Sequence, residues 1–157
     1  MSDTIKSKRL EGTHLIVETK YGTKTYDSRF LVAAFLIYIA RGSGRIEPEE
    51  SAKMIDLIEA HFQMQGAESL ELLTRVMTDM AENPDLAQAL MDLGPTLSDQ
   101  DKEDIALMAL KVIAADGRRE VAEMEKFNEA VKGIGISPEA VHRAFDRYFA
   151  ETMPGTG

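Results

Sequence analysis

Apolar residues recur at the spacing of one helix face along most of the chain, from Asp27 onward. Residues that favour helix starts stand between these segments, including Asp27, Pro48 and Ser98. Glycines that favour helix ends follow several of them, as at Gly133. The pattern predicts seven helices, at about residues 28–41, 48–62, 67–81, 83–95, 98–113, 120–132 and 137–149.

Two of these segments are apolar on almost every side, which is typical of helices surrounded by protein. They are the first, Phe30–Ala40, and the fifth around Ile105–Ile113. We therefore expect an all-α, compact bundle of about seven helices with these two at its centre.

The segment before the first helix has a different pattern. Residues His14–Tyr26 are rich in β-forming side chains and contain a glycine at position 22. This pattern predicts a short hairpin of Leu15–Thr19 with Thr23–Tyr26, which must pack on the helices because an isolated hairpin is marginally stable. The predicted organisation is an N-terminal extension at 1–27, a helical domain at 28–150 and a disordered tail at 151–157.

Composition excludes several classes of site. The chain has no cysteine, so it has no disulfides, thiolate zinc sites or cysteine nucleophiles. A net charge of −9 disfavours binding to nucleic acid and to anionic membranes. It favours binding to cations or basic partner proteins, although it can also serve solubility alone. The longest apolar run, about eleven residues, is too short for a bilayer span and the N-terminus lacks a signal-peptide core, so we expect a cytoplasmic protein without direct membrane insertion.

A duplicated pattern carries the candidate chemistry. Phe30–Phe62 and Ile105–Val131 each read as an apolar helix, a glycine turn and an amphipathic helix. Aligning the glycines at 44 and 117 places Ser43 on Asp116 and Glu50 on Glu123. We expect the two turns to lie side by side.

The acidic residues of these turns form the predicted site. Asp116 and Glu123 can point into one concavity with Glu50, where carboxylate oxygens suit a hard divalent cation. The alternative is structural, since acidic side chains also cap and stabilise helix N-termini. In that case Arg118 and Arg119 pair with the carboxylates at the surface.

Other chemistries fit poorly. The Asp-Gly-x5-Glu spacing equals half of an EF-hand loop, but Val112 and Ala114 occupy its first and third ligand positions. Ser43 has no histidine nearby in sequence to activate it, so we expect no catalytic centre and no enzyme. The acidic start of the fifth helix, 99–104, is expected to be solvated. The three histidines stand far apart in sequence, at His14, His61 and His142.

The repeated turn resembles the tellurite resistance TerB family. The residues that carry this resemblance are Ala-Ala-Asp-Gly-Arg at 114–118 with a glutamate six residues after the glycine, and it extends over about residues 28–150. The family groups with the N-terminal domain of a membrane-anchored DnaJ-type co-chaperone. The resemblance implies a bundle of about seven helices and an acidic metal site linked to tellurite and other chemical stress. It makes Asp116, Glu123 and Glu50 ligands, while Ser43 stands where the family usually has aspartate.

The predicted function is therefore a non-enzymatic, stress-associated domain that binds a divalent cation between its two turns. The alternative is a protein–protein interaction module, whose acidic turn and helical groove bind a basic or helical partner protein.

Overall fold

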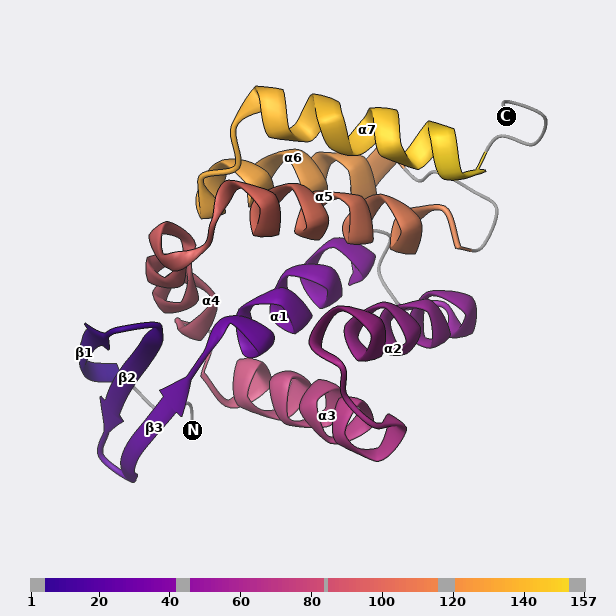
Figure 1. Ribbon diagram of the computed structural model, residues 1–157. Helices are drawn as coiled ribbons and strands as arrows, with labels where there is room; N and C mark the ends of the chain where they lie inside the picture. The colour runs from indigo at the N-terminus through magenta and orange to yellow at the C-terminus, as the bar shows by residue number, and fades with distance from the viewer. Residues whose placement is uncertain (1–4, 42–45, 84, 116–120, 153–157) are drawn as a thin grey trace.

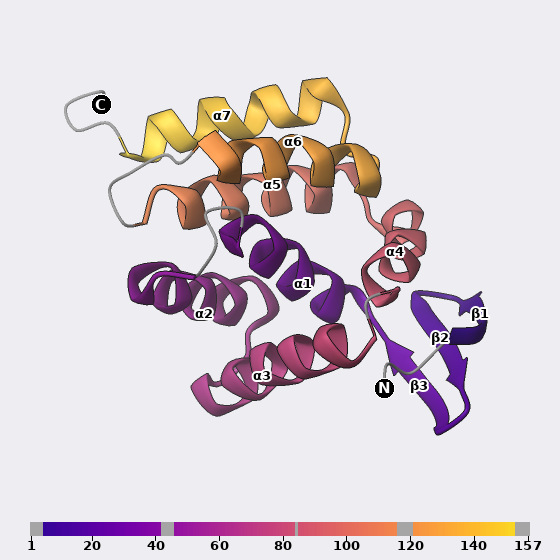
Figure 2. The ribbon, with the colours of Figure 1, turned by 180° about the vertical axis from the view of Figure 1, so that it is seen from behind.

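The computed structural model describes residues 5–41, 46–83, 85–115 and 121–152, and these residues form a mostly helical fold with one small sheet (Figures 1 and 2). The predicted fold class is confirmed to this extent. The α-helices are α1 Ser28–Ala40, α2 Pro48–Phe62, α3 Gly66–Glu82, α4 Leu86–Leu90, α5 Asp99–Ile113, α6 Val121–Ile134 and α7 Pro138–Thr152.

Helix α1 lies in the middle of the molecule. It packs against α2 and α3 on one side and against α5 and α6 on the other, and α7 covers the outer face of α5 (Figures 1 and 2). This position explains its composition: ten of its thirteen residues are buried. Helix α5 is also largely buried, as its apolar sequence predicted.

The predicted helix starts are confirmed by their caps. The Asp27 carboxylate accepts hydrogen bonds from the Arg29 and Phe30 amides, at 3.1 and 3.4 Å, and so caps α1. The Ser98 hydroxyl accepts one from the Asp101 amide at 3.0 Å and caps α5. The predicted fourth helix is divided into α4 and a 3-10 helix, η2 Met91–Thr96, which contains Gly94-Pro95.

The predicted hairpin is present and has a third strand. Strands β1 Ile5–Glu11, β2 His14–Thr19 and β3 Gly22–Tyr26 form an antiparallel sheet in that order. Strand β1 escaped prediction because it is almost entirely polar and exposed, so it has no apolar alternation. The hairpin packs on the helices as expected, and the Tyr26 ring lies 4.5 Å from the Phe30 ring.

The separation of residues 1–27 from 28–150 stays a prediction, and residues 153–157 lie outside the described part of the chain. No helix that the structure describes is both long and apolar enough to cross a membrane.

Candidate functional site

Two of the four predicted ligands, Glu50 and Glu123, can be placed. Each belongs to the first turn of its helix, α2 and α6 respectively, and their exposed fractions are 0% and 1%. Burial this complete is unusual for glutamate and requires hydrogen bonds or opposite charge around the carboxylate. Ser43 and Asp116 lie outside the described residues, as do Arg118 and Arg119.

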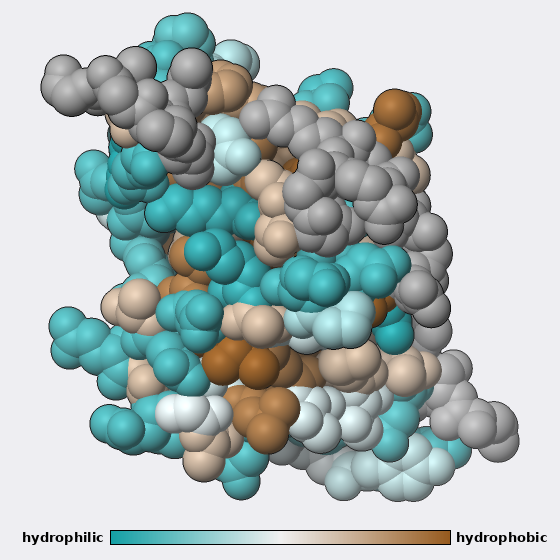
Figure 3. Space-filling view, turned by 90° about the vertical axis from the view of Figure 1, so that its right-hand side faces the viewer, coloured by the Kyte–Doolittle hydropathy of each residue, from teal (hydrophilic) through white to brown (hydrophobic). Residues whose placement is uncertain are grey.

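The two glutamates lie at the same end of the molecule. Helices α2 and α6 both pack on α1 and α5, and both begin at the end that lies on the right in Figure 1 and on the left in Figure 2. Figure 3 faces this end, where the described side chains are mostly hydrophilic around a hydrophobic patch level with α2 and α3. The structure therefore brings the starts of these two helices to one end of the molecule, while the two turns themselves, predicted to lie side by side, fall outside the described residues.

The Glu50 carboxylate also has a local structural role. Its Oε1 accepts a hydrogen bond of 3.1 Å from the Glu47 amide, which satisfies one of the donors at the start of α2. The capping role considered for this residue is thus present.

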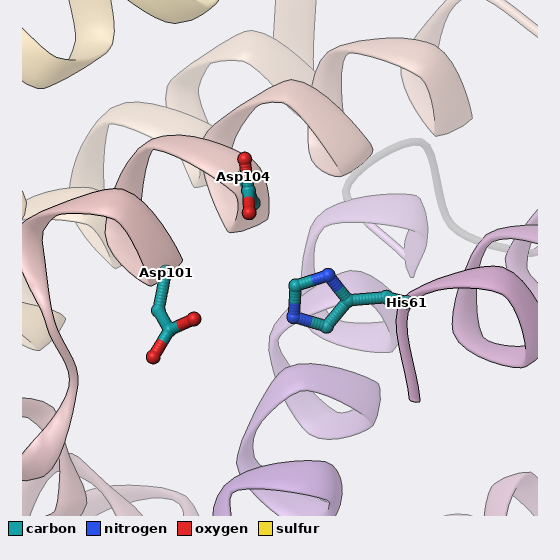
Figure 4. Close-up of side chains that lie close together, drawn as sticks. All are labelled: His61, Asp101 and Asp104. Atoms are coloured by element: carbon teal, nitrogen blue, oxygen red, sulfur yellow. The ribbon is translucent and has the colours of Figure 1, made fainter. Parts of the chain in front are cut away.

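A second group was missed by sequence reasoning. His61 of α2 and Asp101 and Asp104 of α5 lie so that one ligand atom from each falls within 4.8 Å of the others (Figure 4). All three side chains are partly buried, so the expectation that residues 99–104 are simply solvated is wrong for these aspartates. The only sequence signal was the i, i+3 spacing of the two aspartates, because His61 is 40 residues away.

A charged network lies next to this group and joins α5 to α7. Arg143 Nε donates to Glu103 Oε1 at 2.6 Å, and Arg147 Nη1 donates to Glu103 Oε2 at 2.9 Å and to Asp104 Oδ1 at 2.7 Å. Hydrogen bonds from Arg143 and then Arg147 hold the pKa of Glu103 below its ordinary value, although burial acts in the opposite direction.

An apolar pocket of about 290 Å³ lies between α1, α4, η2 and α6. Its lining includes Phe35, Met91 and Ile134, and Tyr38 and Glu129 contribute polar groups. The Tyr38 hydroxyl donates to Glu129 Oε2 at 2.7 Å, and this hydrogen bond raises the pKa of Tyr38.

Comparison with known proteins identifies the family. A family model described as tellurite resistance protein TerB matches residues 29–146, which is most of the chain and includes α1 to most of α7. No curated protein matches, and no solved structure matches.

Proposed function

The chain belongs to the TerB family, which is associated with tellurite resistance, and we propose that it is a non-enzymatic domain that holds a divalent cation at the end where α2 and α6 begin. Glu50 and Glu123 would supply carboxylate oxygens to the ion. Asp116 would add a third carboxylate and Ser43 a hydroxyl, on the alignment of the two repeats.

The observation that carries the proposal is the burial of two equivalent carboxylates at one end of the molecule. A buried carboxylate is costly unless opposite charge or hydrogen-bond donors compensate for it. A divalent cation compensates several carboxylates at once, and oxygen ligands of this kind suit hard ions such as Ca²⁺ and Mg²⁺.

Ser43 lowers the expected affinity. Affinity for a hard cation rises with the number of charged ligands, and a hydroxyl in place of a carboxylate removes one negative charge. The proposed site would then be weak, and replacing this serine by aspartate should strengthen it.

The ion, rather than tellurite, is the proposed ligand. Tellurite is an anion, and like charges repel, so a carboxylate cluster disfavours its direct binding. The contribution to tellurite resistance would then depend on a cation or on a partner protein.

The proposal is tested by titrating the protein with Ca²⁺, Mg²⁺ and Mn²⁺ while following backbone amide resonances or, for paramagnetic Mn²⁺, their broadening. We expect changes at the starts of α2 and α6 for the wild type and for a control, Glu125→Gln, which removes an exposed charge from the same helix. Glu123→Gln should abolish them, and Ser43→Asp should produce them at lower ion concentration. If millimolar ions change none of these resonances in the folded wild type, the cation site is refuted.

The apolar pocket favours a second function, binding of a helical partner protein. A partner recovered from cell extract whose binding is lost in Glu123→Lys but unaffected by chelators would favour this alternative over the cation site. If Glu123→Lys still binds the partner, the partner contacts the pocket and does not need the acidic end.

A further inference from the structure

We propose that His61, Asp101 and Asp104 form a second metal site, specific for a divalent transition-metal ion and separate from the acidic end of the molecule. The site lies at the opposite end of α2 from Glu50, where the last turn of α2 meets the beginning of α5 (Figure 4). It goes beyond the proposed function because it uses different residues and a different ligand chemistry.

The fold explains why these side chains converge. Asp101 and Asp104 are three residues apart, so they lie on the same face of α5. Helix α2 packs against α5, and the imidazole of His61 points from the end of α2 into the space between the two carboxylates (Figure 4). The three ligands therefore come from two elements that tertiary packing holds together.

The distances fit one ion after a small adjustment. Metal–nitrogen and metal–oxygen bonds of about 2.0–2.2 Å place ligand atoms on opposite sides of an ion about 4.2 Å apart, and closer for other arrangements. The candidate ligand atoms lie within 4.8 Å of one another, so rotations of the side chains can bring them into contact with a shared ion.

The surroundings orient Asp104 for such a role. Its Oδ1 accepts hydrogen bonds from Gln100 Nε2 at 2.9 Å and from Arg147 Nη1 at 2.7 Å. Partners of this kind fix the direction of a ligating carboxylate. Arg147 also contacts Glu103, so the positive charge of its guanidinium is shared with that second carboxylate.

The space beside the ligands is small and partly enclosed. A cavity of about 40 Å³ is bounded by His61 and Asp101 and otherwise mainly by apolar side chains, those of Val32, Phe62, Leu97 and Ile105. This volume is enough for an ion or a bound water but not for a larger molecule. The Phe62 ring meets the His61 ring edge-on at 4.7 Å and restricts its orientation.

The ligand types select the ion. An imidazole nitrogen with two carboxylate oxygens suits Fe²⁺, Co²⁺, Ni²⁺ or Zn²⁺, whereas Ca²⁺, Mg²⁺ and Mn²⁺ suit oxygen ligands alone. The two proposed sites should therefore be distinguishable by the ion that each prefers.

The experiment uses Co²⁺ and Zn²⁺ with the full chain. We expect one equivalent of Co²⁺ to give a visible absorption band that Zn²⁺ displaces, and Zn²⁺ to shift the imidazole nitrogen resonances of His61. His61→Ala and Asp101→Asn should each weaken binding by at least about tenfold, as expected for loss of a ligand when even second-shell partners contribute 10–100-fold.

The matched control is His142→Ala. His142 also lies near an aspartate, with Nε2 3.5 Å from Asp146 Oδ2, but this pair is exposed on α7 and belongs to no group of three ligands among the described residues. Its removal should leave Co²⁺ binding unchanged. Because His61 is only partly buried, the His61→Ala variant should fold, and circular dichroism checks this.

Two results would overturn the proposal. One is equal Co²⁺ affinity of the wild type and the folded His61→Ala and Asp101→Asn variants. The other is a His61 resonance that stoichiometric Zn²⁺ leaves unmoved. Either result can occur whether or not Ca²⁺ or Mg²⁺ changes the resonances at the starts of α2 and α6, so the two proposals fail independently.

Discussion

Replacing Gly94 by alanine should test how η2 packs on the end of α6. A Cβ atom at this position would overlap the backbone carbonyl oxygen of Ile134 and lie 3.1 Å from its carbonyl carbon. Carbon atoms in contact are normally about 3.5–4.0 Å apart, so one backbone must move by several tenths of an ångström or more. Overpacking of this kind costs about 1–3 kcal/mol, and because the obstacle is backbone we expect a loss of about 2–3 kcal/mol.

The loss corresponds to a decrease in Tm of about 4–12 °C for a chain of this size. Urea unfolding followed by far-ultraviolet circular dichroism gives the free energy, and thermal unfolding gives Tm. Gly133→Ala is the matched control, because its Cβ would meet the flexible side chain of Met91, 3.0 Å from the sulfur. Gly133 is the penultimate residue of α6, where alanine gains at most the roughly 0.5–1 kcal/mol that it gains inside a helix, so the control should change stability by less than about 1 kcal/mol. Equal stabilities for Gly94→Ala and the wild type, or a larger loss for Gly133→Ala, would refute the reasoning.

Two further predictions concern polar contacts between elements. Glu103→Gln should lower the free energy of unfolding at neutral pH by about 1–2 kcal/mol, a value reduced for the exposure of its arginine partners. Arg143 and Arg147 lower the pKa of Glu103 in the folded state below its ordinary value of 4.5. The stability that these ion pairs give the folded protein is therefore present above about pH 4.5 and is lost as the pH falls through the lowered pKa. Unfolding curves of the two proteins should therefore converge in acid, and a constant difference would contradict this. Tyr26→Phe should lower the free energy of unfolding by about 1 kcal/mol, because the buried Tyr26 hydroxyl donates a hydrogen bond to Asp79 Oδ2 at 3.2 Å. Amide hydrogen exchange in β3 should also become faster in this variant. Unchanged exchange would show that this hydrogen bond does not hold the sheet to α3.

Local chemistry was sufficient to predict the helices. Periodicity gave the apolar faces, and capping residues such as Asp27 and Ser98 gave the starts, because a cap acts within a few residues of its own position. Strand β1 was missed for the converse reason. Its polar residues become a strand by pairing with β2, and that pairing leaves no periodic apolar signal in the sequence.

The candidate site residues also differ in whether the sequence indicated them. The duplicated turn indicated Glu50 and Glu123 from the order of residues alone, since both belong to a repeat that is visible along the chain. Their near-complete burial was not predicted, because helix-start glutamates are normally solvated. His61 gave no signal of proximity to Asp101 and Asp104, which are 40 or more residues away.

The sequence by itself determined the helical class, the positions of the helices, the TerB resemblance and the repeat that contains the predicted ligands. These properties depend on side chains within a few turns of one another or on a pattern repeated along the chain. Tertiary structure alone decided that Glu50 and Glu123 are almost completely buried, and that an imidazole on α2 meets two carboxylates on α5. Such proximity follows from the packing of apolar helix faces, and the apolar residues of these faces do not specify which polar residues become neighbours.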